Sequence, residues 1–191
     1  VGSGVSVTAV HEGKSIDTTM GFSPTSGLIM SSRGGDIDAG LLIHIMRTKK
    51  YTLDEAETYL TLRSGLQGIA GSSDLRIVLD RMMRGDHDAI LGERAFFYGL
   101  HKVLHAYEGI LGGLDVLILT GTAADRNAYV RKRLLEAFAQ RGCVIDTVAN
   151  EECHDRDGLL TTHASSVRAY VCATREMDEI AREAEAFTLS L

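Results

Sequence analysis

The sequence predicts an α/β fold, with a mixed β-sheet flanked by helices. A strand, a loop and a helix follow one another between residues 114 and 140, which is the βαβ pattern of such domains. Two short β-branched stretches at residues 5–10 and 15–19, separated by a turn, predict a hairpin near the start. Between these two units the apolar residues recur at helical spacing.

The N-terminal hairpin leads into a long irregular segment. Val5, Val7 and Val10 alternate with small polar residues, so we expect a strand over residues 5–10, a turn over 11–14 and a strand over 15–19. Residues 21–36 are rich in glycine and serine and contain Pro24, the only proline of the chain. Loops of this length inside compact domains are usually functional, so we expect this one to carry part of a site.

Helices are predicted next, over residues 38–49, 52–63, 74–84 and 92–109. Thr52, with Glu55 three residues later, has the spacing of a capping box at the start of the second helix. Residues 64–73 are again rich in glycine and serine and predict a loop.

The last third alternates strands and helices. The continuous apolar run at 114–119 predicts a strand buried on both faces, followed by a tight loop at 120–125. A helix over 127–140 ends before Gly142, and further strands are expected at 144–148 and 168–173, before a terminal helix over 176–187.

Composition narrows the class of function. The chain has 191 residues and a net charge of −6 with scattered basic residues, which argues against a nucleic-acid surface. No apolar run reaches the roughly 18 residues of a membrane span, and no signal peptide is visible. Cys143, Cys153 and Cys172 lack CxxC spacing, which favours a reducing cytoplasm over disulfides or zinc. Because the chain starts at Val1 without an initiator Met, we expect it to be part of a longer protein.

Four loops carry residues suited to binding an anion. The turn Gly2-Ser3-Gly4 would let backbone N–H groups approach a phosphate, although a tight turn without a ligand is the more common explanation of such a sequence. Arg33 lies among serines and glycines, which suits an anion site, but Asp36 or Asp38 could pair with it instead.

The other two loops precede helices. Ser73 or Asp74 can be explained as the N-cap of the helix that follows, and residues 120–127 lie after a predicted strand, where α/β proteins bind ligands. His101 and His105 have a spacing that could bind a metal, but without a third ligand we expect packing or a dimer surface.

Taken in order, these loops resemble the acetate kinase (acetokinase) family, within the group that shares the actin/sugar-kinase/Hsp70 fold. The resemblance covers nearly the whole chain and corresponds to the family's second half. The family's HLGNG loop is matched by residues 1–4, its DGKSVDTSMGFTP by 12–24 and its TRSGDID by 32–38. Its SGLLGISGLSSDMR is matched by 64–76, its GGLDALVFTGGIGENS by 112–127 and its PTNEE partly by 173–177.

The resemblance implies a ribonuclease-H-like nucleotide-binding domain, the C-terminal domain (1–191) of a two-domain kinase whose N-terminal domain is absent from this chain. The implied reaction moves a phosphoryl group reversibly between ATP and acetate or propionate, with Mg²⁺, in a cytoplasmic homodimer formed through this domain. Arg33 matches the catalytic arginine, Pro24 an acyl-pocket proline and Glu176 a glutamate linked to magnesium. The positions matched to nucleotide binding are Gly2, Ser3, Gly4, Asp74, Leu75, Arg76, Thr122, Ala123, Ala124, Asp125 and Arg126.

Some matched motifs depart from the family pattern. The asparagine of HLGNG is Ser3, two glycines of GGIGEN are lost within residues 121–126, and PTNEE lacks its proline, its asparagine and its second glutamate. Three alternatives therefore stay open: a pyrophosphate-dependent acetate kinase, a degenerate nucleotide-binding domain without catalysis, and a sugar kinase of the same fold. The isolated chain is expected to be inactive, since half of the implied site is missing.

Overall fold

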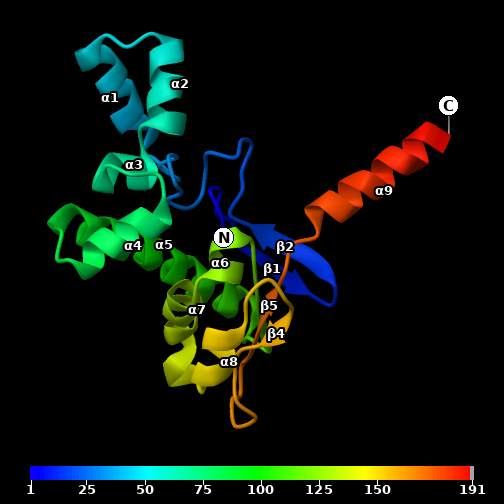
Figure 1. Ribbon diagram of the computed structural model, residues 1–191. Helices are drawn as coiled ribbons and strands as arrows, with labels where there is room; N and C mark the ends of the chain where they lie inside the picture. The colour runs from blue at the N-terminus through cyan, green and yellow to red at the C-terminus, as the bar shows by residue number, and fades with distance from the viewer. Residues whose placement is uncertain (190–191) are drawn as a thin grey trace.

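The computed structural model describes residues 1–189, except for the side chains of Glu176 and Leu189. Figure 1 shows two small sheets with most of the helices on one side of them, and the last helix pointing away on the other side. The elements are β1 (Thr8–His11), β2 (Lys14–Thr18), α1 (Ala39–Lys49), α2 (Leu53–Leu62), α3 (Gly65–Ala70), α4 (Leu75–Met83), α5 (His87–Leu111), β3 (Val116–Thr120), α6 (Thr122–Arg126), α7 (Ala128–Leu135), the 3₁₀ helix η1 (Glu136–Arg141), α8 (Thr147–Glu152), β4 (Gly158–Leu159), β5 (Arg168–Cys172) and α9 (Glu176–Leu189).

The strands form two separate sheets. β1 and β2 pair antiparallel, with a register shift between Ala9 and Val10. The second sheet has the order β3-β5-β4, in which β3 runs parallel to β5 and β4 runs antiparallel to it. The prediction of an α/β fold with a mixed sheet flanked by helices is confirmed.

A groove of about 700 Å³ separates β1 from β3 and is lined by both strands and by α5. Leu117 and Leu119 of β3 are buried in the core, whereas Val116 and Ile118 line the groove and expose 42% and 61% of their surface. The prediction that this strand is buried on both faces is therefore wrong. A continuous apolar run is typical of a strand that is buried on both faces. Among the described residues, only the face of β3 that carries Leu117 and Leu119 is covered.

The main core lies around α5. Phe96, Phe97 and Leu100 of this helix are almost fully buried and share one apolar cluster with Leu134 and Phe138. Burying such side chains contributes about 1.5–3 kcal/mol each, so this cluster holds α5, α7 and β3 together.

Helix α5 begins at His87, earlier than the predicted start at residue 92, because the Asp86 carboxylate caps it by accepting from the Ala89 N–H at 3.0 Å. Gly92 lies inside the helix. A Cβ at Gly92 would lie 3.0 Å from the Cβ of Ala70, so this glycine allows α3 and α5 to pack closely rather than starting a helix.

Four stretches adopt structures that differ from the predictions. Residues 65–70, expected as part of a loop, form α3, and most of the tight loop expected at 120–125 belongs to α6. The strand expected at 144–148 is reduced to one bridge between Ile145 and Thr161, because Asp146 caps α8 by accepting from the Ala149 N–H. The helix predicted over 127–140 divides into α7 and η1.

Helix starts defined by local capping agree with the sequence. The Asp38 carboxylate accepts from the Leu41 N–H at 2.8 Å, and Thr52 and Glu55 form both hydrogen bonds of a capping box.

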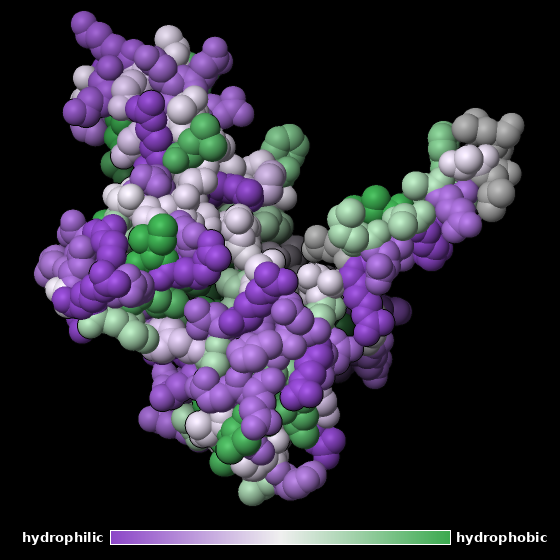
Figure 2. All heavy atoms as spheres, in the orientation of Figure 1, coloured by the Kyte–Doolittle hydropathy of each residue, from purple (hydrophilic) through white to green (hydrophobic). Residues whose placement is uncertain are grey.

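Helix α9 leaves the end of β5 and points away from the sheets (Figure 1). Met177 and Ile180 on this helix expose more than half of their surface, and Figure 2 shows apolar residues along it. None of the described helices combines the length and the apolar composition that crossing a bilayer requires.

Candidate active site

The Gly2-Ser3-Gly4 turn lies directly beside the segment that carries Arg33. The Ser31 N–H donates to the Ser3 carbonyl at 3.2 Å. A Cβ at Gly4 would lie 3.6 Å from Nη1 of Arg33, so the turn and the guanidinium are neighbours. Two motifs that are far apart in the sequence therefore form one surface, which carries backbone groups and a permanent positive charge.

Arg33 also contacts the loop that contains the only proline. Its Nη1 donates to the Pro24 carbonyl at 2.8 Å, and Pro24 is exposed. Neither aspartate that could pair with it does so: Asp36 accepts from the Gly27 N–H at 2.7 Å and Asp38 caps α1. Among the described side chains no carboxylate forms an ion pair with Arg33, so its charge is available to an anion.

The Arg33 segment is held by the start of α3. The Ser64 N–H donates to the Ser32 carbonyl, and the Leu66 N–H donates to the Met30 carbonyl, both at 3.0 Å. Gly65 has a φ of +60°, and a Cβ there would lie 2.6 Å from the Arg33 carbonyl. Only glycine fits at this position, which explains why a glycine-rich stretch forms the support of Arg33.

A pocket of about 470 Å³ is lined in part by Gly2 and Ser3 of this turn. Leu75, Ala123 and Val130 give it apolar walls, and polar groups surround them. Its lining residues are Gly2, Ser3, Ser31, Ser73, Asp74, Leu75, Arg76, Thr122, Ala123, Arg126, Asn127 and Val130. Eight of the eleven positions matched to nucleotide binding thus lie around one cavity.

The other three matched positions lie elsewhere. Gly4 lies beside the Arg33 guanidinium and does not line the pocket. Ala124 is fully buried in the core, and Asp125 is 7% exposed and faces away from this pocket. This follows from the helical structure of α6, because residues on a helix face different directions, whereas a loop would present its backbone along one side.

Helix α6 is brought to the pocket by Gly121. Gly121 has a φ of +89°, and a Cβ there would lie within about 3 Å of the Val1 backbone. The Val1 nitrogen donates to the Thr120 carbonyl, and the Ala123 N–H donates to the Val1 carbonyl at 3.0 Å. The first residues of the chain are therefore joined to the end of β3.

Asp74 and Arg76 form a bidentate pair at the pocket rim. Arg76 donates through Nε at 3.0 Å and through Nη2 at 2.6 Å to the two oxygens of Asp74. These bonds hold the pKa of the Asp74 carboxyl below its ordinary value. The Arg76 side chain is 84% exposed, so the pair contributes little to stability and its groups are accessible to a ligand. Asp74 also caps α4 by accepting from the Arg76 N–H, which confirms the N-cap predicted at this position.

Four lining residues are absent from the predicted set. Ser73 lies within the motif matched over 64–76 and Ser31 directly precedes the one matched over 32–38, but the resemblance assigns the binding roles to their neighbours. Asn127 accepts from the Val130 N–H at 3.1 Å and so caps α7, and both line the pocket. An asparagine directly before an amphipathic helix is an N-cap signal. This signal places Asn127 at the start of α7, next to the loop that precedes the helix.

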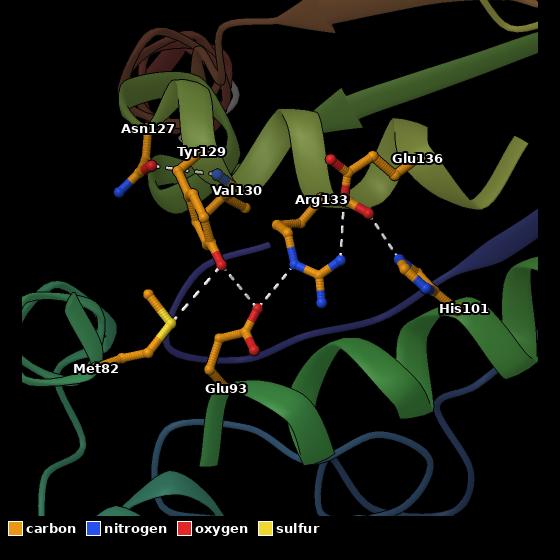
Figure 3. A network of polar contacts seen from close by, with 8 residues as sticks. All are labelled: Met82, Glu93, His101, Asn127, Tyr129, Val130, Arg133 and Glu136. Carbon is orange, nitrogen blue, oxygen red and sulfur yellow. Dashed lines mark hydrogen bonds and ion pairs between the residues drawn. The ribbon is translucent and has the colours of Figure 1, made fainter. Parts of the chain in front are cut away.

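A network of polar contacts lies behind the pocket, between α4, α5 and α7 (Figure 3). Oε1 of Glu93 accepts from the Tyr129 hydroxyl at 2.9 Å and from Nε of Arg133 at 2.8 Å. Arg133 also donates to Glu136 at 3.0 Å, and its guanidinium lies 5.0 Å from the centre of the Phe97 ring. Burial opposes the charge on Arg133, but the two carboxylates outweigh it and raise its pKa above the ordinary value.

The side chain of Glu176, the residue that the resemblance links to magnesium, lies outside the described residues. Its backbone begins α9 just after β5, at the same edge of the sheet where β3 leads into α6. Among the described residues no group of three or more histidine, cysteine or carboxylate side chains is arranged to hold a metal. His101 and His105 therefore belong to no such group. His101 instead bonds through Nε2 with the Arg133 carbonyl at 2.6 Å.

Comparison with known proteins identifies the family. The model of the acetokinase family matches residues 1–182. The chain belongs to the acetokinase family. Acetate kinases of Clostridium botulinum and Sulfurovum sp. are 39% and 33% identical to it over 185 and 186 residues, which is 96% and 97% of this chain and 46% and 47% of the relatives.

Solved acetokinase-family structures have the same fold. The Porphyromonas gingivalis acetate kinase superposes with a TM-score of 0.88 at 30% identity, covering 96% of this chain and 46% of that one. A propionate kinase from Francisella tularensis gives a TM-score of 0.83 at 34% identity, covering 92% and 45%. The actin/sugar-kinase/Hsp70 fold class is thereby confirmed, and the chain spans about half the length of the curated relatives it matches.

Proposed function

We propose that the protein containing this chain is a carboxylate kinase, which transfers a phosphoryl group reversibly between ATP and acetate or propionate. The arrangement that supports this proposal is the Gly2–Gly4 turn, which lines the 470 Å³ pocket through Gly2 and Ser3 and lies beside Arg33, itself bonded to Pro24, at Gly4. A nucleoside in the pocket would extend its phosphates along the turn toward Arg33. The relatives described as acetate and propionate kinases support the same reaction class.

In the proposed reaction a carboxylate oxygen of the substrate attacks the γ-phosphorus of ATP. The bond between that phosphorus and the bridging oxygen breaks, which gives an acyl phosphate and ADP. Arg33 stabilises the negative charge that spreads over the equatorial oxygens, since its planar guanidinium has no carboxylate partner among the described side chains. Pro24 contributes to the acyl pocket, and backbone N–H groups of residues 2–4 bind the phosphates.

We propose Mg²⁺ as the metal, with Glu176 as its protein ligand. Mg²⁺ is usually bound by one or two carboxylates together with substrate phosphates and water, so one carboxylate of the protein would suffice to hold it. When bound, the ion neutralises phosphate charge.

The identity of the phosphoryl donor follows from the lining of the pocket. Pyrophosphate would make no use of the apolar walls formed by Leu75, Ala123 and Val130, so the pocket favours a nucleotide. A pyrophosphate-dependent kinase is the second candidate. Thr122 and Ala124 replace family glycines, and residues 122–126 form a helix. The side chains at these two positions leave a nucleotide less room to approach the backbone than glycines would.

The test is acyl phosphate formation by the full-length protein with acetate, propionate and butyrate, each with ATP or pyrophosphate as donor. We expect turnover with ATP and one of the two shorter acids. Turnover with pyrophosphate alone would replace the proposed donor, and the absence of any turnover would favour a degenerate domain.

We further propose that residues 1–191 form the C-terminal nucleotide-binding domain, that a second domain completes the site, and that the domain pairs with a second copy in the cytoplasm. Helix α1 has no buried residue and exposes Leu41 and Ile43 about half, which supports an apolar partner. The three free cysteines support a reducing compartment. Residues 1–191 alone should give no acyl phosphate, and sedimentation of the full-length protein should give a dimer.

A further inference from the structure

Glu93 is a buried carboxylate with no place in the proposed chemistry. It is 4% exposed and lies on α5, outside the residues that line the pocket. One of its oxygens accepts from two residues of α7, Tyr129 and Arg133. A buried carboxylate is costly unless it is paired and hydrogen-bonded, so this contact is a specific link between α5 and α7.

The link reaches both walls of the nucleotide pocket (Figure 3). Tyr129 lies in the first turn of α7, between Asn127 and Val130, which both line the pocket. The Tyr129 hydroxyl also contacts the sulfur of Met82 at 3.7 Å, at the end of α4. Helix α4 starts at Leu75 and so carries the Asp74–Arg76 wall.

We propose that Glu93 is a positioning residue of the nucleotide pocket, which sets the separation of its two walls by holding the first turn of α7 against α5 and α4. This inference rests on the proposed function of the pocket. The aromatic packing agrees with it: the Tyr129 ring lies edge-on to Phe97 at 6.3 Å, so its hydroxyl has a defined direction toward Glu93.

The test uses the full-length enzyme with Glu93→Gln and Tyr129→Phe. Glu93→Gln keeps the shape and removes the charge that pairs with Arg133, whereas Tyr129→Phe removes one hydroxyl only. We expect Glu93→Gln to raise the KM for ADP about tenfold while kcat falls less than about threefold, the pattern of lost uniform binding. Tyr129→Phe should raise the KM for ADP by about threefold. The KM for acetyl phosphate should stay unchanged in both.

Glu108→Gln is the matched control. Glu108 lies near the other end of the same helix, its side chain is 13% exposed, and it pairs with Arg141 at 3.1 Å and His105 at 3.0 Å. It contributes nothing to the pocket lining. Its substitution should lower the melting temperature without changing the KM for ADP, which separates positioning from general stability.

The positioning role is overturned if Glu93→Gln leaves the KM for ADP unchanged, or if Glu108→Gln raises it equally. It is also overturned if the KM for ADP and for acetyl phosphate rise together, since that would indicate a general loss of structure. A wild-type enzyme that works with pyrophosphate and shows no use of ATP or ADP refutes the nucleotide pocket itself. That result is obtained with the wild-type enzyme alone. Failure of the proposed nucleotide pocket can therefore be distinguished from failure of the positioning role of Glu93.

Discussion

Replacement of Arg131 by methionine should destabilise the protein strongly, because this arginine is fully buried and acts only as a hydrogen-bond donor to neutral groups. Its Nε donates to the Asn150 amide oxygen at 2.9 Å, its Nη1 to the carbonyls of Ala124 and Asp125 at 2.9 and 2.7 Å, and its Nη2 to the Asn150 carbonyl. Burial lowers the pKa of Arg131, but the guanidinium remains charged.

The magnitude follows from these contacts. Arg131→Met leaves four acceptor interactions without a donor, and each buried unsatisfied group costs about 1–3 kcal/mol. The wild-type protein bears the desolvation cost of the cation, and removing that cost offsets part of the loss. We expect a net loss of about 3–5 kcal/mol, near the lower end of the summed cost of the four unsatisfied acceptors. For a domain of this size that corresponds to a fall in melting temperature of about 10 °C.

The assay is urea unfolding followed by circular dichroism, with calorimetry for the melting temperature. Arg182→Met is the control, because Arg182 is 64% exposed on α9 and its replacement should change stability by less than about 0.5 kcal/mol. A loss below about 1 kcal/mol for Arg131→Met would refute the reasoning, since it would mean that the acceptors find other donors. Because two of them belong to α6, the KM for ADP should rise as well.

Three further outcomes are expected. Arg33→Ala should lower the kcat of the full-length enzyme by on the order of 10³-fold, as for loss of an arginine that stabilises phosphoryl transfer, and near-normal turnover would remove it from the mechanism. Asp74→Ala and Arg76→Ala should each raise the KM for ADP more than they lower kcat, and steady-state kinetics in the direction of ATP synthesis measure both. Leu119→Ala, at a buried position, should cost about 2–5 kcal/mol in urea unfolding. Ile118→Ala, at a position 61% exposed, should cost less than half as much.

The elements that could be predicted depend on interactions between residues close in the sequence. Asp38 caps α1, and Thr52 with Glu55 forms the capping box of α2, because each bond spans only three residues. The matched motifs likewise point to Gly2, Arg33 and the 74–76 strip, because each motif consists of neighbouring residues whose order the sequence states directly.

The predictions that failed concern stretches whose conformation depends on distant partners. Residues 65–70 look like a loop because glycine disfavours helices, yet α3 is stabilised by carbonyls of residues 30–32 and by the close contact at Gly65. The exposure of Val116 and Ile118 likewise depends on what lies beside β3, which no pattern in an apolar run reveals.

The sequence by itself determined the family, the mixed α/β fold and the identities of most residues around the pocket. Only the tertiary structure decided that Arg33 contacts Pro24 rather than Asp36, that Asp125 faces away from the pocket, and that Glu93 joins α5 to α7. A motif indicates which side chains a site requires, because its residues are neighbours in the sequence. Which partner each of them meets depends on backbone contacts between segments as far apart as Val1 and Thr120, which form only when the chain folds.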